Sequence, residues 1–399
     1  MNILIIHNFH RPGAPSGDDV VVKQELELLK EHGHNVFLLS KENKDFENFS
    51  IFRKLKTFWE LDYSRDSYEE VLNFLRSKKI DVVHIHNIFP LWTPAVYFAC
   101  KDAGVPVVHT LHDFRFFCAN AFLFRSGEIC DLCFKKSSHY AIYYRCFKGS
   151  LAGSFFVSRY LKKVKSRKIY QMADKYIALT EFAKKKYLDF GIPERKIAIK
   201  PNFIPFTDFN PNFSSKESYF SYVGRISEEK GILTLIEALR YLEGRGLQVK
   251  IAGAGPLEKE LTSSISGVKG IDVEFLGFLP REKVFEIIAK SRALIFPSIC
   301  SESFPTSILE AFSAGTPVIA SNFGAMSHVI SDHRTGLLFE KGNPYDLAEK
   351  ILYLANNPDK AIEMGKNARK EYLEKYTPEV NYNTLMKIYE EVIRENSSK

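Results

Sequence analysis

Short apolar runs rich in β-branched residues alternate with segments of helical periodicity along the whole sequence. This alternation predicts an α/β fold in which parallel strands are joined by helices. Six strands in each half predict two doubly wound, Rossmann-like domains in tandem. The expected strands are Ile3–His7, Val36–Ser40, Val82–His86, Val107–Leu111, Tyr176–Leu179 and Ile197–Pro201 in the first half, and Phe220–Gly224, Gln248–Ala252, Val273–Leu276, Ala293–Phe296, Val318–Ser321 and Gly336–Phe339 in the second.

The same pattern sets the expected domain boundaries. Asn202–Ser218 loses hydrophobic periodicity and contains several turn residues, so it is predicted to be a linker. We therefore expect an N-terminal domain at 1–203, a C-terminal domain at 216–376 and a terminal segment at 377–399. Within that segment Pro378–Glu395 has a single apolar stripe, which predicts a long helix that packs back toward the first domain. Doubly wound domains bind ligands beyond the carboxyl ends of their strands, so we expect the ligand in a cleft shared by the two domains.

Length and composition limit which kinds of protein this sequence can encode. The chain has 399 residues, of which 45% are hydrophobic, and this length is sufficient for more than one core. It shows no signal-peptide pattern at its start, and no uninterrupted apolar run of about 18 residues. A cytoplasmic protein is therefore expected.

The net charge is +7, and its placement is uneven. Between Asp131 and Asp174 there are ten basic residues and no acidic one. Such a run is either a solvated helix face or the contact surface for an anionic partner. Apolar residues from Phe155 to Val164 interleave with the charges, which favours an amphipathic helix on the inner face of the cell membrane, with peripheral association through the basic stretch 135–168. Nucleic acid is not expected as a partner, because no recognised nucleic-acid module accompanies these residues.

Two features of the first half are candidates for ligand contacts. The first expected strand leads through a loop to Gly17, just ahead of a helix from about Val20, where backbone N–H groups can bind a phosphate. The loop lacks a GxGxxG pattern, so an ordinary strand–helix turn is the better interpretation of Gly17 taken alone. His112, followed by Asp113, is a candidate for substrate contacts, and a metal site is the less favoured interpretation of the histidines near the strand ends. These histidines are His84, His86, His109 and His112.

Four cysteines lie in an expected insertion at about 114–150, with the spacing C-x11-C-x2-C-x12-C. Three alternatives remain open for them. They form a closed structural zinc site with four thiolate ligands, they are unligated thiols, or they form disulfides, which a cytoplasmic setting disfavours. The four residues are Cys118, Cys130, Cys133 and Cys146.

The second half opens with a strand that runs into Gly224-Arg225, and Lys230 precedes the following helix. An arginine gives bidentate contacts and a lysine a point charge, so together they suit a diphosphate at a helix N-terminus. Two solvated surface cations are an equally good interpretation of Arg225 and Lys230 taken alone.

Further along, Glu302 and Glu310 are separated by seven residues across a strand–loop–helix transition. Glu302 is expected in the loop, and Glu310 about two turns into the helix. Because Phe304-Pro305 and an apolar helix lie next to them, we favour carboxylates at a cleft over solvated ones. Carboxylates there suit hydrogen bonds from the vicinal hydroxyls of a ribose or a sugar.

Taken in order, these motifs resemble glycosyltransferase family 4 (group 1), whose members are retaining enzymes of the GT-B fold. The resemblance covers nearly the whole chain. The residues that carry it are Gly17, His112-Asp113, Ala178–Phe182, Pro201-Asn202, Gly224-Arg225, Lys230-Gly231, Gly253-Ala254-Gly255-Pro256, Glu302 to Glu310 and Gly315-Thr316-Pro317-Val318.

The resemblance implies a role for each matching residue. Arg225 and Lys230 would neutralise the leaving diphosphate, Glu310 would bind the ribose, and Glu302 would hold the donor sugar. His112 would line the reaction centre. The implied catalytic residues are Arg225, Lys230, Glu302 and His112, and the implied donor-binding residues are Gly17, Gly224, Ser303, Phe304, Pro305, Thr306 and Glu310.

The resemblance also implies the substrates. The donor would be a UDP-, GDP- or ADP-sugar and the acceptor a glycan or lipid-linked glycan, in bacterial surface-polysaccharide biosynthesis and with no cofactor required for catalysis.

No carboxylate nucleophile is evident for the anomeric carbon, so front-face displacement is expected rather than the double displacement of retaining glycosidases. A nucleotide-sugar epimerase of the same fold and a non-catalytic nucleotide-sugar- or glycan-binding module are the rival interpretations.

Overall fold

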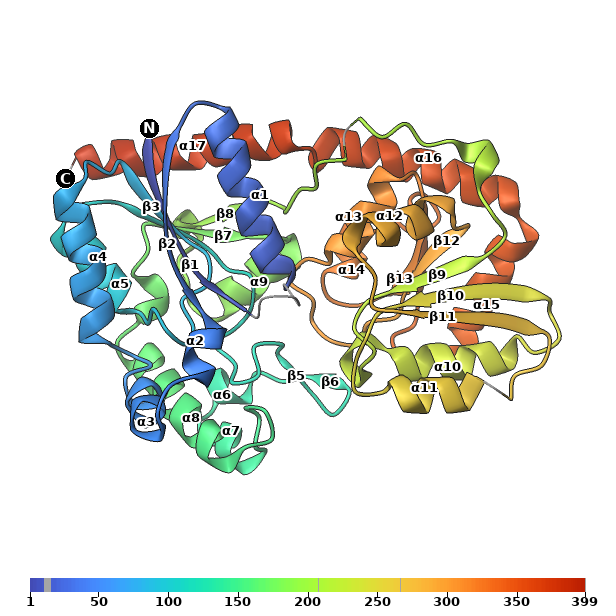
Figure 1. Cartoon of the computed structure of the whole chain (residues 1–399), viewed down its shortest axis with the longest axis horizontal. Helices are drawn as coiled ribbons and strands as arrows, with labels where there is room; N and C mark the ends of the chain where they lie inside the picture. Colours follow the sequence, from blue (N-terminus) through green and yellow to red (C-terminus); the bar gives the residue numbers. More distant parts are fainter. Residues whose placement is uncertain (11–15, 207, 266, 399) are drawn as a thin grey trace. The chain divides into compact units, whose positions relative to one another are not determined.

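The computed structural model describes residues 1–10, 16–206, 208–265 and 267–398 (Figure 1). The chain divides into two compact units. The first comprises Met1–Asn202 together with Asn381 onward, and the second comprises Phe203–Val380. Each unit contains a six-stranded parallel sheet, so the predicted α/β class and all twelve predicted strands are confirmed.

The sheet of the first unit has the strand order β2-β1-β3-β4-β7-β8. The order therefore reverses between β1 and β3. Residues Ile3–Ile6 of β1 are all fully buried, as expected for a parallel strand covered on both faces. The strands are β1 (Asn2–Phe9), β2 (Asn35–Glu42), β3 (Val82–Ile85), β4 (Val107–Thr110), β7 (Lys175–Ala178) and β8 (Ile197–Ile199).

Helices cover both faces of this sheet (Figure 1). Ile3 and Ile5 pack with α1 and α17 on one face, and Leu4 and Ile6 pack with α4, α5 and α8 on the other, because alternate residues of a strand point to opposite faces. The helices and remaining elements of this unit are α1 (Gly17–Glu31), α2 (Asn43–Glu47), α3 (Ile51–Trp59), α4 (Arg65–Ser77), α5 (Ala95–Asp102), β5 (Phe124–Arg125), β6 (Glu128–Ile129), α6 (Leu132–Lys135), α7 (Tyr140–Tyr143), α8 (Leu151–Ser166), η1 (Ile169–Gln171), α9 (Glu181–Asp189), η2 (Glu194–Lys196) and most of α17 (Pro378–Ser397).

The sheet of the second unit has the order β11-β10-β9-β12-β13-β14, which reverses between β9 and β12. Its strands are β9 (Phe220–Val223), β10 (Leu247–Ala252), β11 (Ile271–Gly277), β12 (Ala293–Phe296), β13 (Val318–Ser321) and β14 (Gly336–Phe339). Its helices are η3 (Phe213–Ser215), η4 (Glu228–Lys230), α10 (Ile232–Tyr241), α11 (Glu258–Ile265), α12 (Arg281–Lys290), α13 (Thr306–Ser313), α14 (Met326–Val329), α15 (Pro344–Asn356) and α16 (Pro358–Lys375).

The segment that follows Asn202 is attached to the second unit. The hydroxyl of Tyr372 on α16 donates to the carbonyl of Ile204 at 2.7 Å. The guanidinium of Arg369 on the same helix donates to the carbonyls of Phe206 and Phe209 at 3.2 and 2.6 Å. These bonds tie the beginning of the predicted linker to α16.

The basic stretch forms α6, α7 and α8, and its amphipathic helix does not present its apolar stripe to solvent. Val157, Tyr160, Leu161 and Val164 of α8 are all buried in the core of the first unit. The prediction that these four residues lie on a membrane is therefore wrong, because the protein's own core covers them, whereas Phe155 at the start of the predicted stripe is 48% exposed. Among the described residues, no helix is both long and apolar enough to span a bilayer.

Several charges of the stretch also have partners within the protein. Asp62, whose side chain is 6% exposed, lies 3.2 Å from Arg159, 3.4 Å from Lys163 and 3.4 Å from Arg167. One buried carboxylate thus collects three of the ten cations. Arg159, Lys163 and Arg167 therefore have a structural role, independent of any role of the other cations in the stretch.

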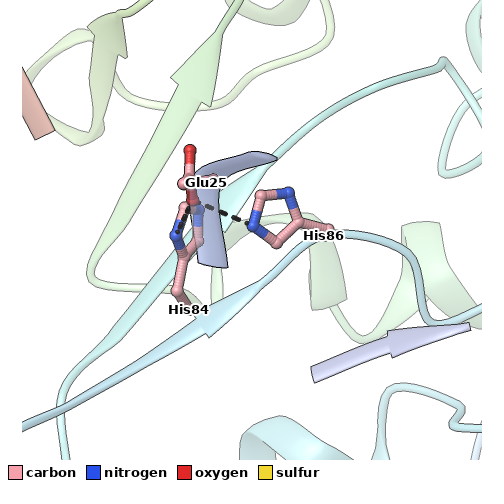
Figure 2. A group of neighbouring side chains, drawn as sticks. All are labelled: Glu25, His84 and His86. Atoms are coloured by element: carbon pink, nitrogen blue, oxygen red, sulfur yellow. Dashed lines mark hydrogen bonds and ion pairs between the residues drawn. The ribbon is translucent and has the colours of Figure 1, made fainter. Parts of the chain in front are cut away.

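A buried ion pair connects elements on one face of the first sheet, and Figure 2 shows its glutamate, Glu25, beside His84 and His86. Glu25 of α1 accepts from the ammonium of Lys200, just after β8, at 2.8 Å, and both side chains are almost inaccessible. Lys200 also donates to Asn381 of α17 at 3.1 Å. The other Glu25 oxygen lies 2.9 Å from Nδ1 of His84 and 3.1 Å from Nε2 of His86, on β3 and just after it. Burial opposes the ionisation of Glu25, but Lys200 and His84 hold its pKa well below its usual range.

Removing one member of this pair should destabilise the first unit. Lys200→Met leaves the Glu25 carboxylate buried and uncompensated, which costs about 3–5 kcal/mol. The double variant Glu25→Gln/Lys200→Met should recover a large part of this loss. Both tryptophans of the chain, Trp59 and Trp92, lie in the first unit, so fluorescence during urea denaturation reports on this unit.

Lys387→Met is the matched control, because Lys387 lies on the exposed side of α17. A Lys200→Met protein as stable as this control would show that the buried pair does not hold the unit together.

Candidate active site

In the second unit the strand order reverses between β9 and β12, and the carboxyl ends of the strands at such a reversal are where doubly wound sheets bind their ligands. The loop after β9 carries Gly224 and Arg225 and leads through η4 to α10. The loop after β12 carries Glu302 and leads to α13. All the site residues predicted for the second unit therefore belong to two neighbouring loops and the helices that follow them.

Gly231 allows these two loops to meet. It has φ +73°, and a Cβ atom there would lie 1.8 Å from the carbonyl oxygen of Pro297. The contact is fixed by two hydrogen bonds to the carbonyl of Glu229, from the Ser298 hydroxyl and the Ile299 N–H, both at 3.1 Å. Any side chain at position 231 would push η4 off the loop after β12. The residue after Lys230 must therefore be glycine for steric reasons.

Two further glycines of the matching motifs pack against the Arg225 loop. A Cβ atom on Gly253 would lie 1.8 Å from the Gly224 carbonyl oxygen, and one on Gly255 would lie 2.2 Å from that of Ile226. The loop after β10 therefore supports the backbone on both sides of Arg225.

Lys230 and Glu302 form the centre of this site. The Lys230 ammonium lies 2.6 Å from Oε1 of Glu302, and the side chains are 28% and 13% exposed. Ser298 donates to the same oxygen at 2.8 Å, and the Cys300 thiol lies 3.6 Å from it. Burial disfavours the Lys230 ammonium, but Glu302 outweighs burial and raises the pKa of Lys230. Lys230 is therefore a permanent cation at neutral pH.

Arg225 is arranged differently from Lys230. Its side chain is 64% exposed, and its guanidinium lies 3.9 Å from the carboxylate of Glu229. The structure thus brings Lys230 to Glu302 and leaves Arg225 at the rim, where it can turn toward a ligand.

Glu310 lies on the inner side of α13. Its carboxylate accepts from Nε of Arg281 on α12 at 3.0 Å, and burial raises its pKa above the usual range despite this contact. Because α13 begins at Thr306, Glu310 is about one turn into the helix, and the predicted position two turns in is wrong. Arg281 was not predicted, because nothing in the local sequence marks it as a partner of Glu310.

The remaining predicted residues of this loop lie at the start of α13. Phe304 is buried, with its ring 6.0 Å from that of Tyr376. Pro305 caps the helix, and Thr306 is its first residue. Ser303 is half-buried just ahead of them.

In the first unit, Gly17 is the exposed first residue of α1. Ser16 caps the helix by accepting from the N–H of Asp19. Asp19 also accepts from Nε2 of His7 at 2.9 Å and from the N–H groups of His10 and Ser16 at 3.2 and 3.1 Å. His10 and Ser16 are thus both bonded to Asp19, and residues 11–15 between them lie outside the described residues.

His112 lines a small hollow at the carboxyl ends of β3 and β4. The hollow is formed by residues that include His86, Asn87, Asp113 and Arg115. Burial lowers the pKa of His112 to about 4. The imidazole is therefore neutral at physiological pH, with one protonated and one unprotonated nitrogen.

A chain of hydrogen bonds indicates which nitrogen carries the proton. Nε2 of His112 lies 2.9 Å from Nδ1 of His86. Nε2 of His86 in turn lies 3.1 Å from the Glu25 carboxylate, the contact that Figure 2 shows. The ionised Glu25 can only accept, so His86 must donate through Nε2 and accept through Nδ1. His112 then donates through its own Nε2, which leaves its Nδ1 as a hydrogen-bond acceptor. Sequence reasoning missed Glu25 because its partner residues are far away in the chain.

Among the described residues, ligand atoms come within 4.8 Å of one another in two groups, Glu25 with His84 and His86, and His7 with Asp18 and Asp19. The first group is better explained by the buried ion pair, since the ammonium of Lys200 on the same carboxylate opposes a metal cation. A metal site was the less favoured prediction for these histidines.

The four cysteines of the insertion are free thiols. Neighbouring thiols among them influence one another's pKa. Burial, and then the neighbouring Cys118 and Cys146 thiols, raise the pKa of Cys133 to about 12. No cysteine belongs to either of the two compact ligand groups within the described chain. The zinc site therefore stays a prediction.

Two family models match the chain. One, described as Glycosyltransferase Family 4, matches residues 15–207, and the other, described as Glycosyl transferases group 1, matches residues 204–371. The uncharacterized glycosyltransferase MJ1178 of Methanocaldococcus jannaschii is 27% identical to the chain, over 88% of each. The D-rhamnosyltransferase WbpZ of Pseudomonas aeruginosa is 34% identical over 40% of the chain and 42% of its own length.

Solved structures share the fold. A glycosyltransferase from Rickettsia africae superposes with a TM-score of 0.70 at 18% identity, covering 98% of each chain. Anabaena HepE in complex with UDP and glucose superposes with a TM-score of 0.67 at 17% identity, covering 97% of this chain and 99% of its own. With the two models in tandem over residues 15–371, the chain belongs to the group 1 glycosyltransferases of family 4 and is a transferase with the GT-B fold.

Proposed function

We propose that the protein transfers a sugar, with retention of anomeric configuration, from a UDP-, GDP- or ADP-sugar to a glycan or lipid-linked glycan. The observation that carries this proposal is the Lys230–Glu302 pair at the strand reversal of the second unit. Relatives support the setting: similar proteins include the capsular polysaccharide biosynthesis glycosyltransferase CapM of Staphylococcus aureus, 27% identical over 56% of this chain and 63% of its own length. HepE, of the same fold, has been solved with UDP-glucose.

The leaving group needs cations that are in place before the reaction. As the glycosidic bond breaks, negative charge develops on the departing diphosphate, and preorganised donors stabilise it most in a water-poor site. Lys230 supplies a fixed ammonium, and Arg225 a guanidinium that is free to turn toward the phosphates from the rim. Glu302 keeps Lys230 charged and in position until the donor arrives.

Carboxylates then hold the sugar and the ribose. The contacts of Glu302 with Lys230 and Ser298 both use Oε1, so we assign Oε2 to a hydroxyl of the donor sugar. Glu310 accepts from the ribose hydroxyls. Because Glu302 is engaged in an ion pair, we assign it no nucleophilic role, and the departing phosphate takes the proton of the incoming acceptor hydroxyl on the same face. In the first unit, Nδ1 of His112 accepts a hydrogen bond from a substrate hydroxyl.

Removing either cation should slow transfer. Lys230→Ala should lower kcat about 100- to 1000-fold, the usual cost of losing one preorganised donor. Arg225→Ala should lower it at least about tenfold, since a hydrogen bond to a charged group contributes about 1.5–3 kcal/mol. The assay is release of nucleoside diphosphate during single-sugar transfer, after a screen of UDP-, GDP- and ADP-sugars, with the anomeric configuration of the product determined by NMR.

Arg240→Ala is the matched control, because it removes an exposed guanidinium of α10 that pairs with Glu237 at 2.6 Å. Unchanged turnover in both the Arg225 and the Lys230 variants would reject the assignment. Turnover of the donor to an isomer without any acceptor would favour an epimerase instead.

Glu310→Gln should act on binding rather than on the chemical step. Loss of a charged acceptor for the ribose should raise the KM for the donor about tenfold or more, with little change in kcat, because the ribose contacts are the same before and during the reaction. Glu286→Gln on the exposed side of α12 is the control. A fall in kcat at constant KM would place Glu310 at the reacting centre.

We also propose that Cys118, Cys130, Cys133 and Cys146 hold one structural zinc ion. The C-x2-C spacing and the free state of all four thiols support it. Purified protein should contain about one equivalent of zinc, and Cys130→Ser/Cys133→Ser should lose it together with thermal stability. Metal-free protein in which all six cysteines react with a thiol reagent would contradict the proposal.

A further inference from the structure

Helix α3 exposes an apolar face. Ile51, Phe52, Leu55 and Trp59 lie on one side of the helix by their spacing, and they are 75%, 85%, 49% and 57% exposed. No residue of α3 is fully buried. Four large apolar side chains on a nine-residue helix are therefore left in water, where an isolated helix of this length is marginal.

Neighbouring helices extend this face. Leu151 and Phe155 of α8 are 54% and 48% exposed, and Tyr143 of α7 is 79% exposed. The ring of Phe156 lies 5.5 Å from that of Phe155 and 6.5 Å from that of Trp59, so it joins the two helices. Figure 1 shows α3, α7 and α8 together at one end of the first unit. We call the residues Ile51, Phe52, Leu55, Trp59, Tyr143, Leu151 and Phe155 the α3 surface.

The surroundings of the α3 surface are basic. Lys54 and Lys56 flank the apolar side of α3 by their spacing, and Lys56 is paired with Asp66 at 3.3 Å. Lys148 and Lys162 lie on the neighbouring segments, within the stretch that contains no acidic residue. Apolar and aromatic side chains with several lysines beside them match a bilayer with anionic headgroups. The tryptophan on this surface fits the same environment, because tryptophan prefers the boundary between headgroups and hydrocarbon.

We propose that the α3 surface docks on an anionic lipid bilayer, with α3 lying in the interface. The apolar side chains enter the headgroup boundary, and the cations contact lipid phosphates. The membrane contact proposed here thus uses α3 and the exposed start of α8, and not the buried residues Val157 to Val164.

The surface leads toward the hollow of the first unit. The ring of Phe58, on α3, lies 6.2 Å from that of Phe147, and Phe147 lies 6.0 Å from Phe89, which lines the hollow beside His112. Packed aromatic rings thus connect α3 to the wall of the hollow. If the proposed function holds, on which this step rests, the acceptor is a glycan on a lipid carrier, presented from the bilayer to the first unit.

Sedimentation with vesicles tests the docking. The full chain should bind vesicles of phosphatidylcholine and phosphatidylglycerol and bind poorly to phosphatidylcholine alone. Phe52→Ser/Leu55→Ser should weaken binding about tenfold or more, because two large side chains no longer leave water. Both positions are exposed, so the variant should keep the melting temperature of the wild type. Phe278→Ser, at a 67% exposed phenylalanine of the second unit, is the matched control and should bind normally.

The two tryptophans give an independent readout. Trp92 is fully buried and its indole N–H donates to the carbonyl of His7, so vesicles should not change its emission. Trp59 should shift to the blue when anionic vesicles are added, and Trp59→Phe should lose this shift.

Four results would overturn the docking: no binding to vesicles, equal binding to neutral and anionic vesicles, equal weakening by Phe278→Ser, or binding without a Trp59 shift. The absence of vesicle binding would leave a protein partner as the occupant.

Nucleoside diphosphate release with a soluble glycan acceptor separates the two proposals. The Phe52→Ser/Leu55→Ser protein should keep this activity, whereas an inactive wild type that still binds vesicles would reject only the proposed function.

Discussion

Every strand of the two main sheets runs parallel to its neighbours, and this constraint decides where chemistry is found. Helical crossovers cover both faces of a parallel sheet, so polar side chains are left mainly at the edge where the strands end. In the second unit the reversal between β9 and β12 brings Lys230 to Glu302. In the first unit the reversal between β1 and β3 places Gly17 and His112 at the same edge of their sheet.

The strands were predictable for the same reason. A parallel strand buried on both faces is an unbroken apolar run, as in Ile3–Ile6, and such runs are visible without any knowledge of their neighbours. Helix starts are less well marked. The start of α13 has no serine, threonine or aspartate cap, because Pro305 occupies that position, so the sequence misplaces Glu310 by about one turn.

Pairings between distant residues could not be predicted. Lys230 and Glu302 are separated by 72 positions, and Glu25 and Lys200 by 175. Local patterns indicated that Arg225 and Lys230 act as a pair of cations, but only the fold shows that Lys230 is held by a carboxylate and Arg225 is exposed. The same holds for His112, whose protonated nitrogen is assigned through His86 by a glutamate on another helix.

An amphipathic pattern predicts that a helix has an apolar side. It does not predict which part of the protein, or which partner, covers that side. The apolar stripe of α8 was predicted to contact a membrane because many cations lie near it, yet the core of the first unit covers most of it. The stripe of α3 is as apolar and remains exposed. Arg159 joins the two helices, since it pairs with the buried Asp62 and its guanidinium lies 4.2 Å from the centre of the Trp59 ring. A cation held in this way keeps Trp59 in place on an outward face. Phe58 packs this short helix against the core of the first unit, but four large apolar side chains on its other side stay exposed. A helix of this length gains most of its stability from what it contacts, and on the exposed face the protein itself supplies little.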